Sequence, residues 1–559
     1  MEPHGTAVLE KQMRKIRSGS SGFFVPARGQ WASRHAAISG SPHAGRQNRP
    51  RSRKNLDICT RMCYTADMEL FMIGHEYKYA VEQIMLMLFP TERPTYPETP
   101  GEGLTARVSL REGETWATAT TVITDRGQRW YGTARIPVTE LSGDAIVTER
   151  LRQRIVKLSF YRAGVRCLGR KPVWGALSGI RPGKLMRDLL ETGLDDRAAK
   201  AKFIELYDVS GERADLCLDT AHAAMTAEKS LENRDVCLYL GVPFCPTRCA
   251  YCSFVSQAVE KSMALIPPFV EALLQDIRAT AKAVRDCGAR VIAVYYGGGT
   301  PTTLSAQQLE IVLTEMEQCF DLSACREFTV EAGRPDTITR EKLEVLKAHG
   351  VTRVSVNPQT MSDHVLETIG RKHTAADVLR ALDCVRSVGG FQVNMDLIAG
   401  LPEDTADGFK ETLEQVLALG VENVTVHTLA LKKGSRIMLE GTRLPDEYEV
   451  GEMLDYAVER LRGAGYAPYY LYRQKFMSGG FENVGWCRPG TENLYNICIM
   501  EELCSILAIG GGASTKLNLP GGRIERIFAP KYPKEYIDGI GKVCADKQTI
   551  VDLLKGAES

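Results

Sequence analysis

The sequence predicts an α/β protein built around a partial (β/α)6 barrel, with a small α+β N-terminal domain and a mixed C-terminal region. Short runs rich in Val and Ile alternate with amphipathic segments through the middle of the chain. This alternation indicates parallel strands joined by right-handed helical crossovers. Six such units are too few to close an eight-stranded barrel. Polar motifs follow the strand ends, where ligands of such barrels bind.

The barrel units can be placed one by one. The predicted strands cover residues 236–240, 291–296, 328–331, 353–356, 392–398 and 423–428. The segments between them carry apolar residues at helical spacing, and they cover residues 268–285, 306–320, 340–349, 375–388 and 406–419. We therefore assign residues 233–440 to the barrel.

The remaining chain divides into four predicted regions. Residues 1–67 form a basic extension rich in Gly, Ser and Pro, whose composition predicts disorder. This extension resembles a transit peptide, or it precedes a true start at Met68. Residues 68–160 have the pattern of the small α+β domain, and residues 161–232 that of a helical connecting region. Residues 441–559 form the C-terminal region, which we expect to cover the substrate.

Finer signals within these regions predict individual elements. Residues 75–89 have helical spacing, and Asp125-Arg126-Gly127 indicates a hairpin turn. Pro182 is typical of a helix start. The nearby Trp174, Arg181 and Lys184 could contact a ligand, although a surface helix cap is the favoured role. In the C-terminal region we expect a helix over residues 446–464 and an aromatic strand over residues 466–472.

Composition and charge narrow the class of protein. The chain has 559 residues, of which 44% are apolar and 25% charged, with a formal net charge of +1. Residues 1–67 carry 12 basic and 4 acidic residues, so the rest of the chain is mildly acidic, which argues against nucleic acid as a partner. No run approaches the roughly 18 apolar residues of a membrane span. Sixteen cysteines without a signal peptide favour a reducing cytoplasm and thiols that are buried or bind metal.

A cysteine-rich loop directly follows the first predicted strand. Cys245, Cys249 and Cys252 are spaced C-x3-C-x2-C, and Pro243 and Pro246 keep the loop out of helix and strand. Three thiolates can hold three irons of a [4Fe–4S] cluster and leave the fourth iron open to a ligand. Zinc sites favour a second cysteine pair about 12–20 residues further on, and none follows here. Zinc and a chance spacing remain the alternatives.

Polar motifs follow the other predicted strands at the same edge. Each motif alone is more often structural, but five of them at one edge indicate a binding site. Asp396 lies in a run otherwise suited to burial, where a carboxylate is costly unless it is bonded, so we expect it to meet a ligand hydroxyl. The motifs are the cysteine loop, Gly297-Gly298-Gly299-Thr300-Pro301, Glu331, Asn357-Pro358-Gln359 with Gly370-Arg371, and Asp396 to Pro402.

The cysteine loop resembles the signature of the radical S-adenosylmethionine (SAM) superfamily, with Tyr251 at the aromatic position before the third cysteine. Together the motifs are similar to those of the oxygen-independent coproporphyrinogen III oxidase family, most specifically over residues 230–440. The resemblance implies that Cys245, Cys249 and Cys252 bind a [4Fe–4S] cluster. It also implies a set of SAM contacts: Tyr239, Tyr251, Gly298, Gly299, Thr300, Glu331, Gln359, Arg371, Asp396 and Ala430.

The same resemblance implies an activity. A reduced cluster would cleave SAM to a 5′-deoxyadenosyl radical, which removes hydrogen from a propionate of coproporphyrinogen III. Loss of carbon dioxide and one electron then leaves a vinyl group, twice per molecule, giving protoporphyrinogen IX for haem biosynthesis. The implied partners are the tetrapyrrole and a low-potential electron donor such as flavodoxin or ferredoxin, with no nucleic acid and no membrane span. A cytoplasmic monomer is expected.

One residue departs from the family pattern. Phe254 stands where the best-studied members carry a further cysteine, and this Phe is typical of the related haem-chaperone branch. The chaperone's His-Asn-x-x-Tyr-Trp motif is absent, and Leu494-Tyr495-Asn496 lacks the His. The extra N-terminal domain and the segments 468–473 and 482–486 resemble a third, longer branch. A haem-binding protein and a radical SAM enzyme with another substrate remain the alternative hypotheses.

The C-terminal region offers candidate substrate contacts. Tyr469, Tyr472, Arg473 and Lys475 are aromatic or basic residues that could line a porphyrin cleft. A layer that covers the open side of the barrel is an equally good interpretation. The glycine run from Gly510 to Gly512 is more often a turn than a phosphate site.

Overall fold

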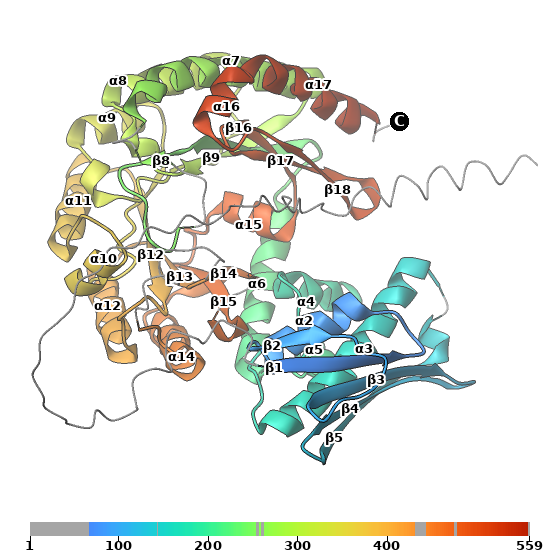
Figure 1. The fold of residues 1–559 in the computed structure, drawn as a ribbon. Helices are drawn as coiled ribbons and strands as arrows, with labels where there is room; N and C mark the ends of the chain where they lie inside the picture. The colour runs from blue at the N-terminus through green and yellow to red at the C-terminus, as the bar shows by residue number, and fades with distance from the viewer. Residues whose placement is uncertain are drawn as a thin grey trace, which may run out of the picture. The chain divides into compact units, whose positions relative to one another are not determined.

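The computed structural model describes residues 66–141, 143–252, 257–258, 262–430, 443–474 and 478–556, and Figure 1 shows their elements. Two large sheets organise these residues, one of five strands and one of eleven. No helix in these ranges is long and apolar enough to cross a membrane. Residues 1–65, and with them Cys59 and Cys63, lie outside the described residues.

The five-stranded sheet belongs to the N-terminal part of the chain and has the order β2-β1-β3-β4-β5. Buried and more exposed residues alternate along β4, so one face of the sheet packs against helix α3. The predicted hairpin turn is confirmed, since β4 pairs with β5 and both Arg126 and Gly127 have positive φ. The elements are β1 Ala66–Ile73, α2 Lys78–Leu88, β2 Glu92–Thr95, β3 Leu104–Glu112, β4 Trp116–Asp125, β5 Gln128–Pro137 and α3 Ala145–Leu168.

Three helices connect this sheet to the barrel: α4 Pro182–Glu191, α5 Asp196–Tyr207 and α6 Gly211–Lys229. Pro182 opens α4, as predicted. Trp174 is buried and donates a hydrogen bond to Glu482 Oε2 over 2.5 Å. Arg181, the N-cap residue of α4, and Lys184 both form ion pairs with Glu502. These three residues therefore tie the connecting helices to the C-terminal region. Helix α3 runs across the predicted boundary at residue 160. The domain boundaries remain predictions.

The barrel strands are confirmed, and all six are parallel neighbours in the order β6-β9-β10-β11-β12-β13. Every residue of β10 is buried, as expected for a strand covered on both faces. The strands are β6 Asp235–Val242, β9 Arg290–Gly298, β10 Glu327–Val330, β11 Arg353–Ser355, β12 Gln392–Ala399 and β13 Asn423–Thr428. The helices are α7 Ile266–Cys287, α8 Ala306–Cys319, α9 Arg340–Ala348, α10 Asp363–Thr368, α11 Ala375–Val388 and α12 Ala406–Leu419.

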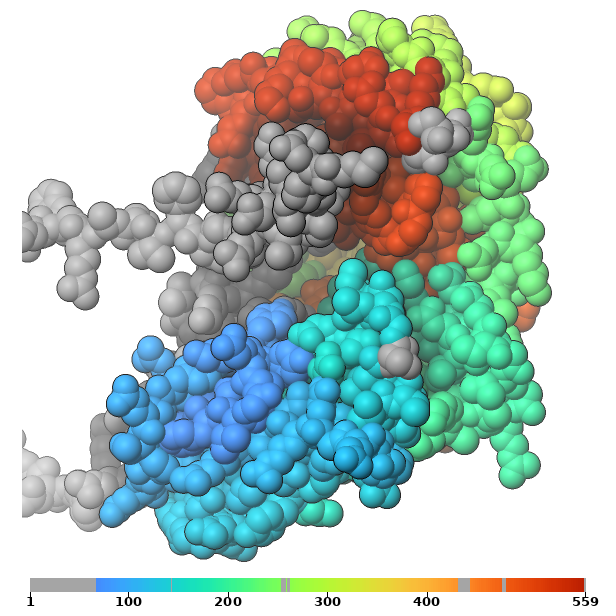
Figure 2. Space-filling model, turned by 90° about the vertical axis from the view of Figure 1, so that its right-hand side faces the viewer, coloured from blue at the N-terminus to red at the C-terminus, as the bar shows by residue number. Residues whose placement is uncertain are grey.

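The C-terminal region extends the barrel sheet at both edges. At one edge β13 pairs with antiparallel β15, which pairs with β14; at the other, β6 pairs with parallel β16, followed by β17 and β18. On the face in Figure 2, the C-terminal residues (red) lie against the green segment, consistent with the packing of α17 on α7. The elements are α14 Glu447–Gly463, β14 Ala467–Arg473, β15 Glu482–Cys487, α15 Leu494–Glu501, β16 Ser505–Gly510, β17 Ser514–Leu519, β18 Arg523–Phe528, α16 Pro533–Asp538 and α17 Ile540–Gly556.

The predicted helix over residues 446–464 and the aromatic strand over residues 466–472 are confirmed as α14 and β14. The fold class is likewise confirmed: a partial (β/α)6 barrel carries an N-terminal α+β part and a mixed C-terminal region. The sheet is an open one, because its outermost strands β14 and β18 do not pair with each other.

Candidate functional site

The cysteine loop lies at the C-terminal edge of the barrel, directly after β6. Cys245 ends the two-residue strand β7 (Phe244–Cys245), which pairs with β8 (Gln257–Ala258). Cys245, Cys249 and Cys252 are all half-buried. Thr300 Oγ1 donates to Cys245 Sγ over 3.7 Å, and Arg334 Nη1 donates to Cys249 Sγ over 3.6 Å. The ends of β9 and β10 therefore reach the loop thiols.

The glycine run after β9 is tied to the cysteine loop by main-chain hydrogen bonds. Gly299 N donates to Val242 O over 2.6 Å, and Thr300 N donates to Phe244 O over 2.8 Å. A Cβ on Gly299 would lie 2.3 Å from Phe244 O, and Gly298 has a φ of +106°. Only glycine fits both positions without displacing backbone. The glycines therefore allow the main chain after β9 to approach the cysteine loop closely.

Arg371 connects the cysteine loop to the end of β11. Its Nη1 donates to Asn357 O over 2.7 Å, and its Nη2 donates to Tyr251 Oη over 3.3 Å. Burial raises the pKa of Tyr251 above its ordinary value, so the ring stays neutral. Gln359 is buried in the left-handed region at φ 69°, and its N–H donates to Asp396 O over 2.9 Å. A non-glycine residue held at positive φ is typical of functional sites.

Two carboxylates lie inside the barrel, and their pKa values move in opposite directions. Burial raises the pKa of Glu331 to about 7, although Tyr295 Oη donates to Glu331 Oε1 over 2.5 Å. Burial also opposes ionisation of Asp396, but the nearby His427 and the hydrogen bonds to the carboxylate outweigh it and lower the pKa of this carboxyl. Near neutral pH, Glu331 is therefore poised between its two forms and Asp396 is ionised.

Asp396 is already bonded inside the protein. Asn357 Nδ2 donates to Asp396 Oδ2 over 2.7 Å, and Asn394 Nδ2 donates to Oδ1 over 2.8 Å. His427 Nε2 lies 3.8 Å from Asp396 Oδ2. These contacts account for the burial of this carboxylate without the ligand hydroxyl that we expected from the sequence.

Tyr239 and Ala430 complete the predicted set. Tyr239 lies on β6, and its ring stacks on Tyr295 and Tyr495 with centroid separations of 6.3 and 6.2 Å. Tyr295 donates a hydrogen bond to Glu331, so the ring of Tyr295 lies between Tyr239 and that carboxylate. Ala430 is half-buried and follows the end of β13, at the same edge as the other residues.

Sequence reasoning missed several polar residues of this site. Arg334 is 3% exposed and donates to Thr247 Oγ1 over 2.9 Å as well as to Cys249. It lies three residues after Glu331, beyond the end of β10, so the rule that located Glu331 could have found it. The signals for Tyr295 and His427 were weaker, because each is a single polar residue inside a strand.

The candidate substrate contacts of the C-terminal region have separate environments. Tyr469 is buried, and Arg473 donates from Nε to Gly480 O over 3.0 Å. These two residues support the covering-layer interpretation. Tyr472 Oη lies 3.5 Å from His427 Nδ1, so Tyr472 approaches the barrel interior. Lys475 lies outside the described residues.

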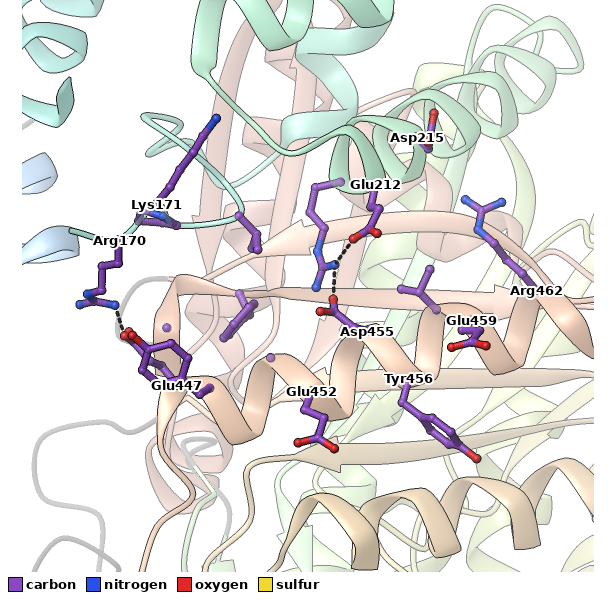
Figure 3. Close-up of a pocket in the computed structure, with 18 of the residues that line it drawn as sticks. Arg170, Lys171, Glu212, Asp215, Glu447, Glu452, Asp455, Tyr456, Glu459 and Arg462 are labelled. Atoms are coloured by element: carbon purple, nitrogen blue, oxygen red, sulfur yellow. Dashed lines mark hydrogen bonds and ion pairs between the residues drawn. The ribbon is translucent and has the colours of Figure 1, made fainter. Parts of the chain in front are cut away.

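A cavity of about 1180 Å³ lies elsewhere in the described residues. Figure 3 shows acidic side chains along α14, among which Glu447 points toward Arg170 and Asp455 points toward α6. Arg170 pairs with Glu447, and Arg213 pairs with Asp455. None of the predicted site residues lines this cavity. It is a charged interface between helices, remote from the cysteine loop.

Comparisons with known proteins agree with this geometry. The radical SAM superfamily profile matches residues 239–416, which include the cysteine loop and the ends of β6, β9, β10, β11 and β12. The oxygen-independent coproporphyrinogen-III oxidase-like protein HemZ of Bacillus subtilis is 39% identical over 373 residues, 65% of this chain and 74% of HemZ. The heme chaperone HemW of Haemophilus influenzae is 29% identical over 54% of this chain and 76% of HemW.

A solved structure is similar at lower identity. Coproporphyrinogen III oxidase HemN from Escherichia coli, described as a radical SAM enzyme, aligns with a TM-score of 0.47 and 21% identity. The alignment covers 60% of this chain and 78% of HemN.

The residues of the loop fit the cofactors of this superfamily, a [4Fe–4S] cluster and SAM. Three half-buried thiols in one loop supply sulfur ligands, and donors reach two of them. The glycine run packs its main chain directly against the segment that leads into Cys245, where added Cβ atoms would collide. On this geometry and the match to HemZ, the chain belongs to the oxygen-independent coproporphyrinogen III oxidase family of the radical SAM superfamily, in a longer branch with an extra N-terminal domain.

Proposed function

We propose that this radical SAM protein is an oxidoreductase that converts the propionates of coproporphyrinogen III to vinyl groups, giving protoporphyrinogen IX. One observation carries the proposal. Polar groups that follow β9, β10 and β11 contact a loop with three thiols, inside a barrel of this family. The name of the HemZ relative supports the same reaction class.

In this proposal the loop thiols Cys245, Cys249 and Cys252 hold the cluster. Arg334 and Thr300 donate to two of these sulfurs, and such donors stabilise charge on metal-bound thiolates. Thr247 is held by the same Arg334 side chain, so the guanidinium fixes the loop as well as the sulfur. Arg334 is thereby a positioning residue of the cluster site.

SAM would occupy the strand ends next to the loop. Its amino group would meet the main chain of Gly298, Gly299 and Thr300, and an ionised Glu331 would supply the opposite charge. Arg371 would supply the positive charge that pairs with the carboxylate of SAM. The remaining proposed SAM contacts are Tyr239, Tyr251, Gln359, Asp396 and Ala430.

When bound, the cluster and SAM supply a radical that can remove hydrogen from an unactivated carbon. The protein's own contribution is position and the exclusion of water. Tyr251 packs against a cluster of buried apolar residues that includes Leu366, Leu401 and Leu429. This apolar wall lies beside the Arg371 contact, so it would shield the reacting atoms from solvent.

Substrate and electron delivery follow from the same assignment. The substrate is a tetrapyrrole, and Tyr472 with His427 forms a polar pair that could face it. A low-potential donor such as flavodoxin or ferredoxin would reduce the cluster. The loop cysteines are half-buried rather than fully enclosed, which leaves a short path from the surface. We expect a monomer that works in the cytoplasm.

An anaerobic product assay tests the proposal. The reconstituted protein should release carbon dioxide and 5′-deoxyadenosine from coproporphyrinogen III when supplied with SAM and dithionite, and Cys249→Ala should release neither. An intact cluster with neither product would exclude this substrate. SAM cleavage without carbon dioxide would indicate a radical SAM enzyme that acts on another substrate.

A haem-binding function is the second candidate. Two relatives named heme chaperone HemW, from Haemophilus influenzae and Lactococcus lactis, are 29% and 31% identical and are covered over 76% and 68% of their length. Phe254, typical of that branch, is present in the sequence and lies outside the described residues. Stoichiometric haem binding without turnover of coproporphyrinogen III would favour this function over the first.

A further inference from the structure

A second group of three thiols lies inside the barrel, away from the cysteine loop. Cys237 lies on β6, Cys498 on α15, and Cys504 just before β16. Their sulfur atoms all lie within 4.8 Å of one another, and Cys237 Sγ is 3.6 Å from Cys504 Sγ. All three side chains are buried. Three separate segments therefore bring one sulfur each to a single point.

The spacing of these sulfurs suits one metal ion. Zinc–thiolate bonds are about 2.3 Å long, which places the sulfurs of a three- or four-coordinate site about 4 Å apart. The observed separations need only small side-chain movements to reach this value. In the described part of the chain, the loop thiols Cys245, Cys249 and Cys252 do not form such a close group. Ligands of separate irons in a cluster lie farther apart than ligands of one ion.

The surroundings distinguish this group from ordinary buried cysteines. Cys504 Sγ is in hydrogen-bonding contact with both other thiols, Cys237 and Cys498. The backbone N–H of Cys237 also donates to the Cys504 sulfur. Main-chain donors of this kind commonly support metal-bound thiolates. A thiolate among apolar neighbours such as Ile292 and Ile506 would be costly without a cation beside it.

Packing alone and a disulfide are the competing explanations. Single buried cysteines pack as small apolar side chains, but packing does not require three sulfurs to converge. A disulfide would bring two sulfurs to about 2.05 Å, whereas Cys237 and Cys504 are 3.6 Å apart and Cys498 lies in the same group. Soft thiolate ligands select Zn²⁺ or Cu⁺ among common ions. Because three thiolates carry three negative charges, a divalent ion leaves the smaller net charge in this apolar site.

We infer that Cys237, Cys498 and Cys504 form a second metal site, which binds one zinc ion and joins α15 to β6 and to the start of β16. Tyr495 of α15 stacks on Tyr295 with a centroid separation of 4.5 Å, and Tyr295 donates to Glu331. By holding Cys498, the ion would fix the position of α15 and with it the ring of Tyr495 in this stack. Since the ligands come from distant segments, metal binding would contribute to folding.

Metal analysis of the full chain tests this inference in a background without the loop cluster. Cys245, Cys249 and Cys252 are replaced by Ala, and the protein is purified anaerobically with a thiol reductant and without chelator. We expect one zinc per chain by mass spectrometry of the metal. Loading with Co²⁺ should give an intense thiolate-to-cobalt band in the near ultraviolet. In this background, Cys498→Ser should lower bound zinc at least tenfold and abolish the band.

Cys217→Ser is the matched control, because Cys217 is fully buried on α6 and lies outside the group. This variant should keep both the zinc and the cobalt band. If Cys498→Ser does not fold, the cobalt spectrum of the background protein still decides the question. A folded background protein without zinc and without the band would overturn the inference. Zinc that persists in Cys498→Ser would also overturn it. So would a disulfide between Cys237 and Cys504, detected as a protein mass lower by two hydrogen atoms.

Discussion

The two thiol groups of this barrel differ in the distance along the chain over which they are assembled. Cys245, Cys249 and Cys252 occupy one loop of a few residues, are half-buried, and receive hydrogen bonds from Thr300 and Arg334. The group around Cys504 comes from three segments, is buried, and holds its sulfurs within 4.8 Å of one another. The first arrangement suits a cluster that must meet a ligand, and the second suits an enclosed ion.

This difference shows that thiol spacing along the chain and thiol spacing in space carry separate information. In the loop, local turns determine where the sulfurs lie, since Cys252 N donates to Cys249 O over 3.2 Å. In the second group, the parallel pairing of β6 with β16 brings Cys237 beside Cys504. Substitutions that affect one group and spare the other test whether the two are independent.

The largest effect is expected from Cys249→Ala. Iron should fall from about four atoms per chain to near zero and SAM cleavage should reach background, because one iron loses its only protein ligand. Metal analysis and the visible spectrum of the anaerobic protein measure this. Cys384→Ala, at a half-buried thiol on α11, should keep the iron. Zinc in the second group should also remain; its loss together with iron would show that the two groups are not independent.

A smaller but still large effect is expected from Gly299→Ala. The new Cβ would lie 2.3 Å from Phe244 O. Relief requires displacement of the backbone that carries Cys245, so unfolding should become about 1–3 kcal/mol easier. Iron incorporation should fall at least twofold. Gly103→Ala is the control, since no atom lies within 4 Å of its Cβ position. Urea unfolding and iron analysis measure these effects. Equal unfolding free energies and equal iron contents in the two variants would contradict the prediction.

Arg334→Met tests the support of the loop without changing a ligand. It removes donors to Thr247 and Cys249, so we expect a loss of about 1–3 kcal/mol in the free energy of unfolding. The cluster should assemble but lose iron faster on exposure to a chelator. Arg340→Met replaces an exposed arginine of the neighbouring α9 and should change stability by less than about 0.5 kcal/mol. Equal rates of iron loss in the two variants would show that Arg334 does not support the cluster.

The smallest effect concerns Glu331, which joins the loop site to the tyrosine stack above the second thiol group. Because burial raises the pKa of Glu331 to about 7, its charge is full above that pH and is lost as the pH falls through it. SAM affinity should therefore weaken up to about tenfold per pH unit below 7. Glu331→Gln should bind SAM more weakly at pH 8 and should show little change between pH 6 and 8. Calorimetric titration measures both proteins.

Tyr295→Phe sharpens this test. It removes the hydrogen bond that lowers the pKa of Glu331, so the midpoint of the affinity profile should move to higher pH. The raised pKa also has a consequence for the ligand-free protein. Stability should decrease as the pH rises from the usual value of 4.5 to about 7, since the unfolded state ionises first. A wild-type affinity that is flat between pH 6 and 8 would contradict the role given to Glu331.

Most of the barrel could be predicted because its signals are local. The periodicity of each segment placed all six strands and five of the helices between them within a few residues, and α12 was predicted over its full extent, Ala406–Leu419. The short helix α10 was not predicted. Such patterns arise from burial of one helix face or of both strand faces, which neighbouring residues determine. Strand-end reasoning also brought Glu331 and Arg371 to the correct edge of the sheet.

The contacts that decide the site's chemistry could not be predicted in the same way. The environment of Asp396 depends in part on Asn357, which follows β11, so this bond appears only when β11 and β12 pair. Arg334 is recognised as a partner of Cys249 only in three dimensions. The sequence also did not show that the C-terminal strands extend both edges of the barrel sheet.

The sequence by itself determined the alternation of strands and helices, the cysteine loop with its spacing, and the family. Those features depend on residues close together along the chain, where covalent geometry limits the possibilities. Only the tertiary structure decided which side chains bond the carboxylates, and that Cys237, Cys498 and Cys504 meet. Cys237 and Cys504 are 267 residues apart, and only strand pairing and side-chain packing, which depend on the whole fold, bring such residues together.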